Sequence, residues 1–121
     1  MIYTSTKTVT LAAALIAISA SASIAADFAT DAEITAAMSD RTYLGGMLTG
    51  TFSEYYAADG TIKGDGYGGK WRAADNSMCF QYGTDPESCW QLKINGEAVT
   101  LFKDGKVDGS GVVVEGNPNN Y

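Results

Sequence analysis

The chain has 121 residues, in which 8 lysines and arginines stand against 14 acidic residues, a formal net charge of −6 at pH 7. It has two cysteines and no histidine. The absence of histidine excludes Ser-His-Asp and Cys-His catalysis and imidazole ligation of zinc, copper or haem. The acidic balance argues against nucleic acid and anionic membrane surfaces, which attract clustered cations. We therefore expect no nucleic-acid partner, no metal and no cofactor.

Residues 1–26 have the pattern of a secretory signal peptide. Lys7 is their only charged residue, an apolar run of ten residues follows it, and small residues complete the segment. The run is too short for a membrane span of about 20 residues; a buried N-terminal helix is the alternative. We expect cleavage after Ala25 or Ala26 and, because no cysteine precedes Cys79, no membrane anchor. The mature protein would be periplasmic or secreted, with a net charge of −7.

Residues 27–45 are predicted to form one short helix and a lead-in to the next unit. Thr30 and Glu33 have the spacing of a capping box, in which the threonine is the N-cap and the glutamate bonds back to it. Gly45 and Gly46 are expected to end this helical segment. Four apolar side chains can share one face of the helix: Phe28, Ile34, Ala37 and Met38.

Residues 46–116 are predicted to form an antiparallel β meander. Aromatic and β-branched segments alternate with turn signals, which indicates about seven short strands joined by hairpins. We expect a mainly β fold, either a strongly bent sheet or a small barrel, with the short N-terminal helix covering one end or face. A flat two-layer sandwich is the alternative. Residues 117–121 would form a C-terminal tail. The turn signals are Asp59-Gly60, Gly68-Gly69, Asp75-Asn76, Gly83 to Glu87, Asn95-Gly96, Asp104-Gly105 and Asp108-Gly109.

Cys79 and Cys89 lie on two segments that we predict to be paired strands. Phe80 and Trp90 alternate with the cysteines, so the aromatic rings face the core and the cysteines take the opposite, polar face. Directly opposed residues of a non-hydrogen-bonded pair have Cα atoms about 5 Å apart, within disulfide range. Nine intervening residues and the lack of histidine argue against a C-x-x-C redox centre and a zinc site. We predict a structural disulfide; regulatory or unpaired thiols are the alternatives.

Aromatic residues before the cysteines are the candidate binding residues. Tyr55 and Tyr56 are adjacent, so on a strand one of them must face away from the core. Tyrosine and tryptophan combine apolar area with a polar tip, which suits ligand pockets and interfaces. We predict a non-enzymatic binding module whose aromatic surface contains Tyr55, Tyr56, Tyr67 and Trp71. Its partner would be a small apolar molecule or an envelope protein; ordinary core and rim packing is the alternative.

Three acids offer an enzymatic interpretation. Glu54 with Asp59 or Asp65 would supply the two carboxylates that a hydrolase of envelope glycans needs; surface acids beside a turn are the simpler account. Residues 59–65 lack the alternating acids and closing glutamate of an EF-hand, and no G-K-[ST] follows the glycines of residues 64–69 as in a phosphate loop. A third interpretation is a structural or stress-related envelope protein without a specific ligand.

A series of short motifs runs through residues 46–121. In order they are EYYAADGTIKG, GGKW, MCFQYG with a second cysteine ten residues on, DGK and GNPNN. This order resembles a family of small exported alphaproteobacterial proteins classed as a domain of unknown function, with a YYxxDGTxxG…GxW…C…C…GNP pattern. The resemblance implies a disulfide between Cys79 and Cys89 and implies no activity. A looser, fold-level likeness to lipocalin-type small barrels rests on the G-x-W and the meander.

Overall fold

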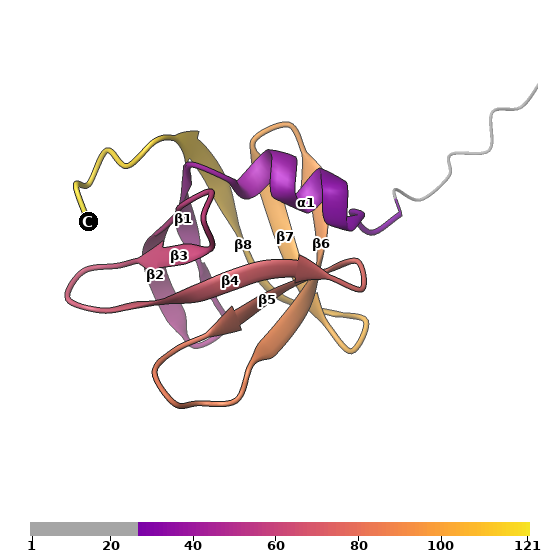
Figure 1. Ribbon diagram of the computed structural model, residues 1–121. Helices are drawn as coiled ribbons and strands as arrows, with labels where there is room; N and C mark the ends of the chain where they lie inside the picture. Colours follow the sequence, from indigo (N-terminus) through magenta and orange to yellow (C-terminus); the bar gives the residue numbers. More distant parts are fainter. Residues whose placement is uncertain (1–26) are drawn as a thin grey trace, which may run out of the picture.

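The protein is described by a computed structural model over residues 27–121; the predicted signal peptide and its cleavage site lie outside the described residues. Each strand pairs antiparallel with the next and the last strand pairs with the first, so the sheet is a closed barrel (Figure 1). The predicted small antiparallel barrel is confirmed, with eight strands where about seven were expected. The elements are α1 (Asp31–Met38), β1 (Arg41–Met47), β2 (Gly50–Tyr56), β3 (Thr61–Lys63), β4 (Gly68–Ala74), β5 (Ser77–Gln81), β6 (Ser88–Asn95), β7 (Ala98–Lys103) and β8 (Lys106–Glu115).

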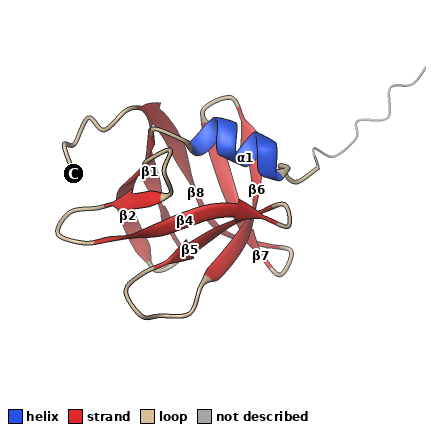
Figure 2. Cartoon of the chain, viewed as in Figure 1, coloured by secondary structure: helices blue, strands red, loops and turns tan. Residues whose placement is uncertain are grey.

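Helix α1 lies across one end of the barrel (Figure 2). Its N-terminus is the predicted capping box, in which the Thr30 hydroxyl accepts a hydrogen bond from the Glu33 N–H and the Glu33 carboxylate accepts one from the Thr30 N–H. Asp31 and Asn76 exchange two hydrogen bonds, which tie the helix to the β4–β5 turn. Among the described residues, no helix has the length and apolar character needed to cross a membrane.

Strand β1 corrects the expectation that Gly45 and Gly46 end the helical segment. The helix ends at Met38, and both glycines lie inside β1. Every residue of β1 pairs with β2 on one side and with β8 on the other. Hydrogen bonds from both neighbours therefore keep the segment extended despite the weak strand propensity of glycine. The Gly68-Gly69 pair, also predicted as a turn, likewise lies inside β4.

Asp108-Gly109 is a second corrected turn, because it lies inside β8. Leu101 pairs with Gly109 and Phe102 pairs with Val107, so Asp108 is left over as the extra residue of a β-bulge. A bulge interrupts the regular ladder and bends the strand locally. Residues typical of a turn therefore occur at this bulge although the chain does not reverse its direction there.

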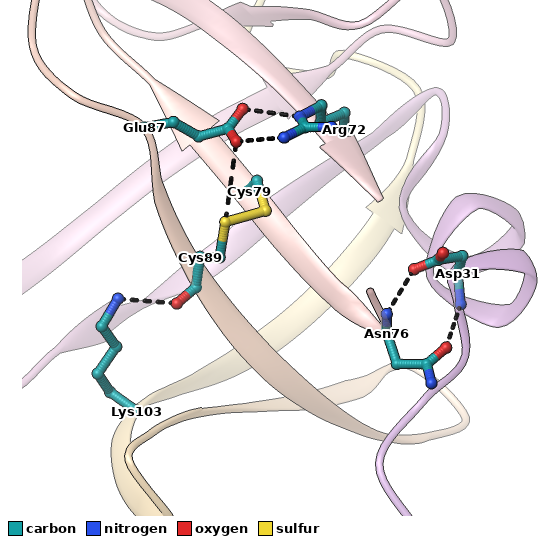
Figure 3. Close-up of a disulfide and its surroundings, with 7 residues drawn as sticks. All are labelled: Asp31, Arg72, Asn76, Cys79, Glu87, Cys89 and Lys103. Carbon is teal, nitrogen blue, oxygen red and sulfur yellow. Dashed lines mark hydrogen bonds and ion pairs between the residues drawn. A yellow bond between two sulfur atoms is a disulfide. The ribbon is translucent and has the colours of Figure 1, made fainter. Parts of the chain in front are cut away.

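The disulfide between Cys79 and Cys89 is confirmed, with the two residues directly opposite each other in the β5–β6 ladder. Figure 3 shows that the Arg72–Glu87 ion pair lies beside it. This pair is bidentate, with N–O distances of 2.6 and 2.8 Å. Phe80, which alternates with the cysteines, faces the barrel interior as predicted and is 6% exposed. The hairpin thus carries its disulfide on the outer face of the sheet, where Cys79 is itself buried, and its aromatic packing on the inner face.

The barrel interior is divided into two halves. The half next to α1 is filled by buried side chains. The other half lies at the opposite ends of the strands, where the β1–β2, β3–β4, β5–β6 and β7–β8 loops surround the barrel opening. Inward-facing residues alternate with outward-facing ones along each strand, so both halves draw on the same strands. The filled half contains Ile34, Met38, Tyr56, Ile62, Trp71, Met78, Leu92, Val99 and Val113.

Candidate functional site

A cavity of about 700 Å³ occupies the half of the barrel away from α1. Its volume falls within the range of about 300–1,000 Å³ that is usual for small-molecule sites. Polar groups reach it from four side chains, those of Glu54, Tyr67, Tyr82 and Asp85. The rest of its side-chain wall is apolar or aromatic and comes from five strands: Met47, Phe52, Phe80, Trp90 and Leu101.

Glu54 is the most unusual member of the cavity wall, because it is a charged residue that is only 3% exposed. Three tyrosine hydroxyls donate hydrogen bonds to its carboxylate. Tyr67 reaches Oε1 at 2.8 Å, Tyr56 reaches Oε2 at 2.9 Å, and Tyr82 reaches both oxygens at 2.8 and 2.9 Å. Burying a carboxylate is unfavourable unless it is hydrogen-bonded, and these tyrosines meet that requirement.

The three tyrosines remain hydrogen-bond donors at neutral pH. Burial raises the pKa of Tyr56, Tyr67 and Tyr82, and the neighbouring Glu54 carboxylate raises each pKa further. Within residues 27–121, no lysine or arginine forms an ion pair with Glu54. The negative charge of this carboxylate is therefore met by neutral donors only.

Two glycines make room for the tyrosine rings that cover Glu54. A Cβ atom on Gly64 would overlap the ring of Tyr67, and one on Gly69 would lie 2.8 Å from the ring of Tyr82 and 2.6 Å from a backbone carbonyl oxygen. Contacts this close require a neighbouring group to move. The glycine-rich segment therefore shapes the cavity wall.

The structure brings two of the four predicted aromatic residues to this site. Tyr67 lines the cavity, and Tyr56 supports Glu54 from the filled half of the barrel. Tyr55 faces outward and donates a hydrogen bond to an aspartate that precedes β1. Trp71 is buried in the filled half, where its indole N–H donates to a carbonyl of the β2–β3 turn.

Of the three predicted acids, only Glu54 lines the cavity. Asp59 lies in the β2–β3 turn, where hydrogen bonds from Thr61 lower its pKa. Asp65 is exposed in the β3–β4 loop. The second carboxylate of the cavity wall is that of Asp85, which is exposed in the β5–β6 loop. The acid pairs considered from the sequence therefore do not face each other across this cavity.

Phe52, Tyr82, Trp90 and Asp85 were not predicted as cavity residues. Period-two alternation does place Phe52, Tyr82 and Trp90 on inner faces, as it does the residues of the filled core. The alternation does not distinguish a side chain that packs in the core from one that borders an empty space. That difference arises only when the strands are assembled.

A scan of protein-family models finds no match to this chain, and neither a curated protein nor a solved structure matches it.

Proposed function

We propose that this protein is a non-enzymatic binding module that holds a small, predominantly apolar molecule inside its barrel. The observation that carries the proposal is the cavity of about 700 Å³, which is walled by apolar and aromatic side chains and contains a few convergent polar groups. Small-molecule sites typically have this combination of an apolar wall and a few placed polar groups. The apolar wall would supply most of the affinity, and the Glu54 cluster would orient the ligand.

A binding function has more support than hydrolysis. A glycosidase needs two carboxylates placed across the scissile bond, one of them free to give a proton. The carboxylate of Glu54 accepts hydrogen bonds from three tyrosines, and neither Asp59 nor Asp65 lines the cavity. A purely structural role also has less support, because it gives no reason for a cavity of about 700 Å³ with an apolar wall and a few convergent polar groups.

An envelope-protein partner has less support than a small ligand. The large apolar side chains exposed on the described part of the chain are few: Leu44, Leu48, Tyr67, Val107 and Val112. We further propose that the protein is exported, since its disulfide is the kind of bond that persists in the periplasm or outside the cell. The resemblance to a family of exported proteins of unknown function stays a prediction.

The proposal can be tested with N-phenylnaphthylamine, a neutral apolar dye whose fluorescence rises in apolar surroundings. We expect saturable binding at one site. Leu101→Trp places a larger side chain in the cavity and should abolish this binding. Leu44→Trp is the matched control, because Leu44 faces outward on β1 and is 37% exposed, so this variant should bind the dye like the wild type.

A second cavity variant, Met47→Trp, tests the same prediction if Leu101→Trp does not fold. Met47 is a half-buried residue of the cavity wall, so a larger side chain there is better tolerated. The proposal is wrong if the wild type shows no saturable binding, or if the folded cavity variants bind the dye as tightly as the Leu44→Trp control.

A further inference from the structure

The cavity wall carries negative charge and no positive charge. Glu54 and Asp85 contribute carboxylates, and among residues 27–121 no lysine or arginine lines the cavity. Lys103 packs on one aromatic residue of the wall, with its Nζ 4.5 Å from the ring centroid of Trp90. This ammonium group donates a hydrogen bond to the carbonyl oxygen of Cys89 at 2.8 Å and makes no ion pair with Glu54. The buried carboxylate therefore has no positive partner in residues 27–121.

The hydrogen-bond donors of the wall side chains are already engaged. The hydroxyls of Tyr67 and Tyr82 donate to Glu54, and the indole N–H of Trp90 donates to Asp108 at 2.8 Å. A hydroxyl has one proton to donate, while its oxygen and a carboxylate keep acceptor lone pairs. Toward a ligand, the polar cluster thus offers acceptors only. A carbonyl or a carboxylate on the ligand would find no free side-chain donor there.

The aromatic rings around the cluster add to this preference. Phe52, Tyr67, Phe80, Tyr82 and Trp90 all line the same cavity. The face of an aromatic ring carries negative electrostatic potential and attracts an ammonium group within about 6 Å of its centroid. The Lys103 ammonium already lies over the Trp90 ring in this way, so the rings left for a cation of the ligand are those of Phe52, Tyr67, Phe80 and Tyr82. The aromatic rings and the Glu54 carboxylate therefore both favour a positively charged group.

From these contacts we infer that the ligand carries a positively charged nitrogen, as an amine or quaternary ammonium group on an apolar body. The nitrogen would lie against Glu54 and the tyrosine oxygens, and the apolar body would fill the space toward Leu101 and Met47. This inference rests on the proposed binding function and names the ligand class of the same site. An anionic ligand would be opposed by the unpaired charge of Glu54.

A matched set of probes with one rigid apolar body tests the inference: adamantylammonium, adamantanol and adamantanecarboxylate. Dissociation constants for the wild type would be measured by calorimetry. We expect the ammonium to bind about tenfold more tightly than the alcohol, because both can donate a hydrogen bond to the Glu54 carboxylate but only the ammonium adds the attraction between opposite charges. The carboxylate should bind more weakly than the alcohol.

Glu54→Gln removes the charge while keeping nearly the same shape. It should weaken binding of the ammonium probe about tenfold and weaken binding of the alcohol less, because the alcohol loses only part of one hydrogen bond whereas the ammonium also loses its charge partner. Glu97→Gln is the matched control, since Glu97 is exposed in the β6–β7 turn at the α1 end of the barrel and gives the same change in net charge. This control should leave the affinities for all three probes unchanged.

The outcomes separate the two proposals. If the wild type binds the alcohol or the carboxylate as tightly as the ammonium, the inference about charge is overturned, while dye binding still supports a binding module. It is also overturned if a folded Glu54→Gln variant keeps full affinity for the ammonium. If neither the dye nor any adamantyl probe binds, both proposals fail. The comparison of the three probes on the wild type needs no variant. It therefore tests the inference about charge even if Glu54→Gln does not fold.

Discussion

Glu54 shows how a charged side chain is accommodated inside this barrel. Its carboxylate accepts hydrogen bonds from Tyr56, Tyr67 and Tyr82. Each tyrosine packs its aromatic ring around the carboxylate and donates its hydroxyl to it, so apolar packing and polar satisfaction come from the same residues. The cluster stays open on one side, toward the cavity, where Tyr67 is 45% exposed.

The tyrosines predict a loss of stability in alkali. Burial and the Glu54 carboxylate raise the pKa of Tyr56, Tyr67 and Tyr82 in the folded protein, whereas tyrosines of the unfolded chain ionise near pH 10. Their contribution to stability is therefore complete below about pH 10 and is lost as the pH rises toward the folded pKa values. We expect the free energy of unfolding to fall by up to about 1.4 kcal/mol per pH unit for Tyr56 and for Tyr82, and by less for Tyr67, whose half-exposed ring is partly screened by water.

Denaturant unfolding as a function of pH, together with tyrosinate absorbance, measures this effect. The native protein should ionise its tyrosines at higher pH than the chain in denaturant. Tyr82→Phe should make the free energy of unfolding less dependent on pH above about pH 10. Tyr55→Phe, at the outward-facing tyrosine of β2, is the control and should change this dependence less. Coincident native and denatured titrations would contradict the prediction.

The β5–β6 hairpin shows how alternation assigns two roles to adjacent residues. Phe80 and Trp90 meet inside the barrel edge to face, with ring centroids 5.4 Å apart. Cys79 and Cys89 are joined on the outside, with Cα atoms 4.0 Å apart. The disulfide closes the β5–β6 loop, which carries Asp85 of the cavity wall. It therefore limits the movement of one side of the cavity mouth.

Removal of both thiols predicts a defined loss of stability. Cys79→Ala with Cys89→Ala should lower the free energy of unfolding by roughly 2.5–3 kcal/mol, the chain-entropy value for a loop of this length. Denaturant unfolding measures this change, and a reducing agent should destabilise the wild type but not the double variant. Arg72→Ala breaks only the exposed ion pair beside the disulfide and should lower the stability far less than loss of the disulfide does. Two free thiols in the wild type, titrated in denaturant without reductant, would contradict the prediction.

The barrel is closed by the pairing of its first strand, β1, with its last strand, β8. Every residue of β1 pairs with a residue of β8, for example Tyr43 with Val113. Closure gives both strands a partner on each side, so no edge strand remains in the described sheet. It also produces the barrel interior, of which α1 covers one end, while the other end opens to solvent as the cavity.

Native-state hydrogen exchange tests this closure. If β1 and β8 are paired on both sides, their amides should be protected to the same degree as those of β6 and β7. In an open sheet the two strands would be edges, and every second amide of β1 and β8 would exchange rapidly. The exposed loop at residues 65–67 provides a fast-exchanging reference in the same experiment. Rapid exchange along β8 would show that the barrel is open in solution.

Features that depend on neighbouring residues were predictable. The capping box joins Thr30 to Glu33, and the disulfide joins residues separated by 10 positions. Alternation along a strand identified Phe80 and Trp90 as inward-facing, since it needs only the order of adjacent residues. The same alternation required Tyr55 and Tyr56 to point in opposite directions, without showing which of them faces inward.

Features that depend on distant strands became visible only in the assembled barrel. β1 passes through Gly45 and Gly46, whose extended conformation is supported by β2 and β8. Glu54 meets Tyr67 and Tyr82 across 13 and 28 positions of the chain. The cavity is the space that remains when side chains from several strands and α1 have been packed together. Its position depends on how the volumes of all these side chains fill the barrel together, which cannot be read from any single segment of the sequence.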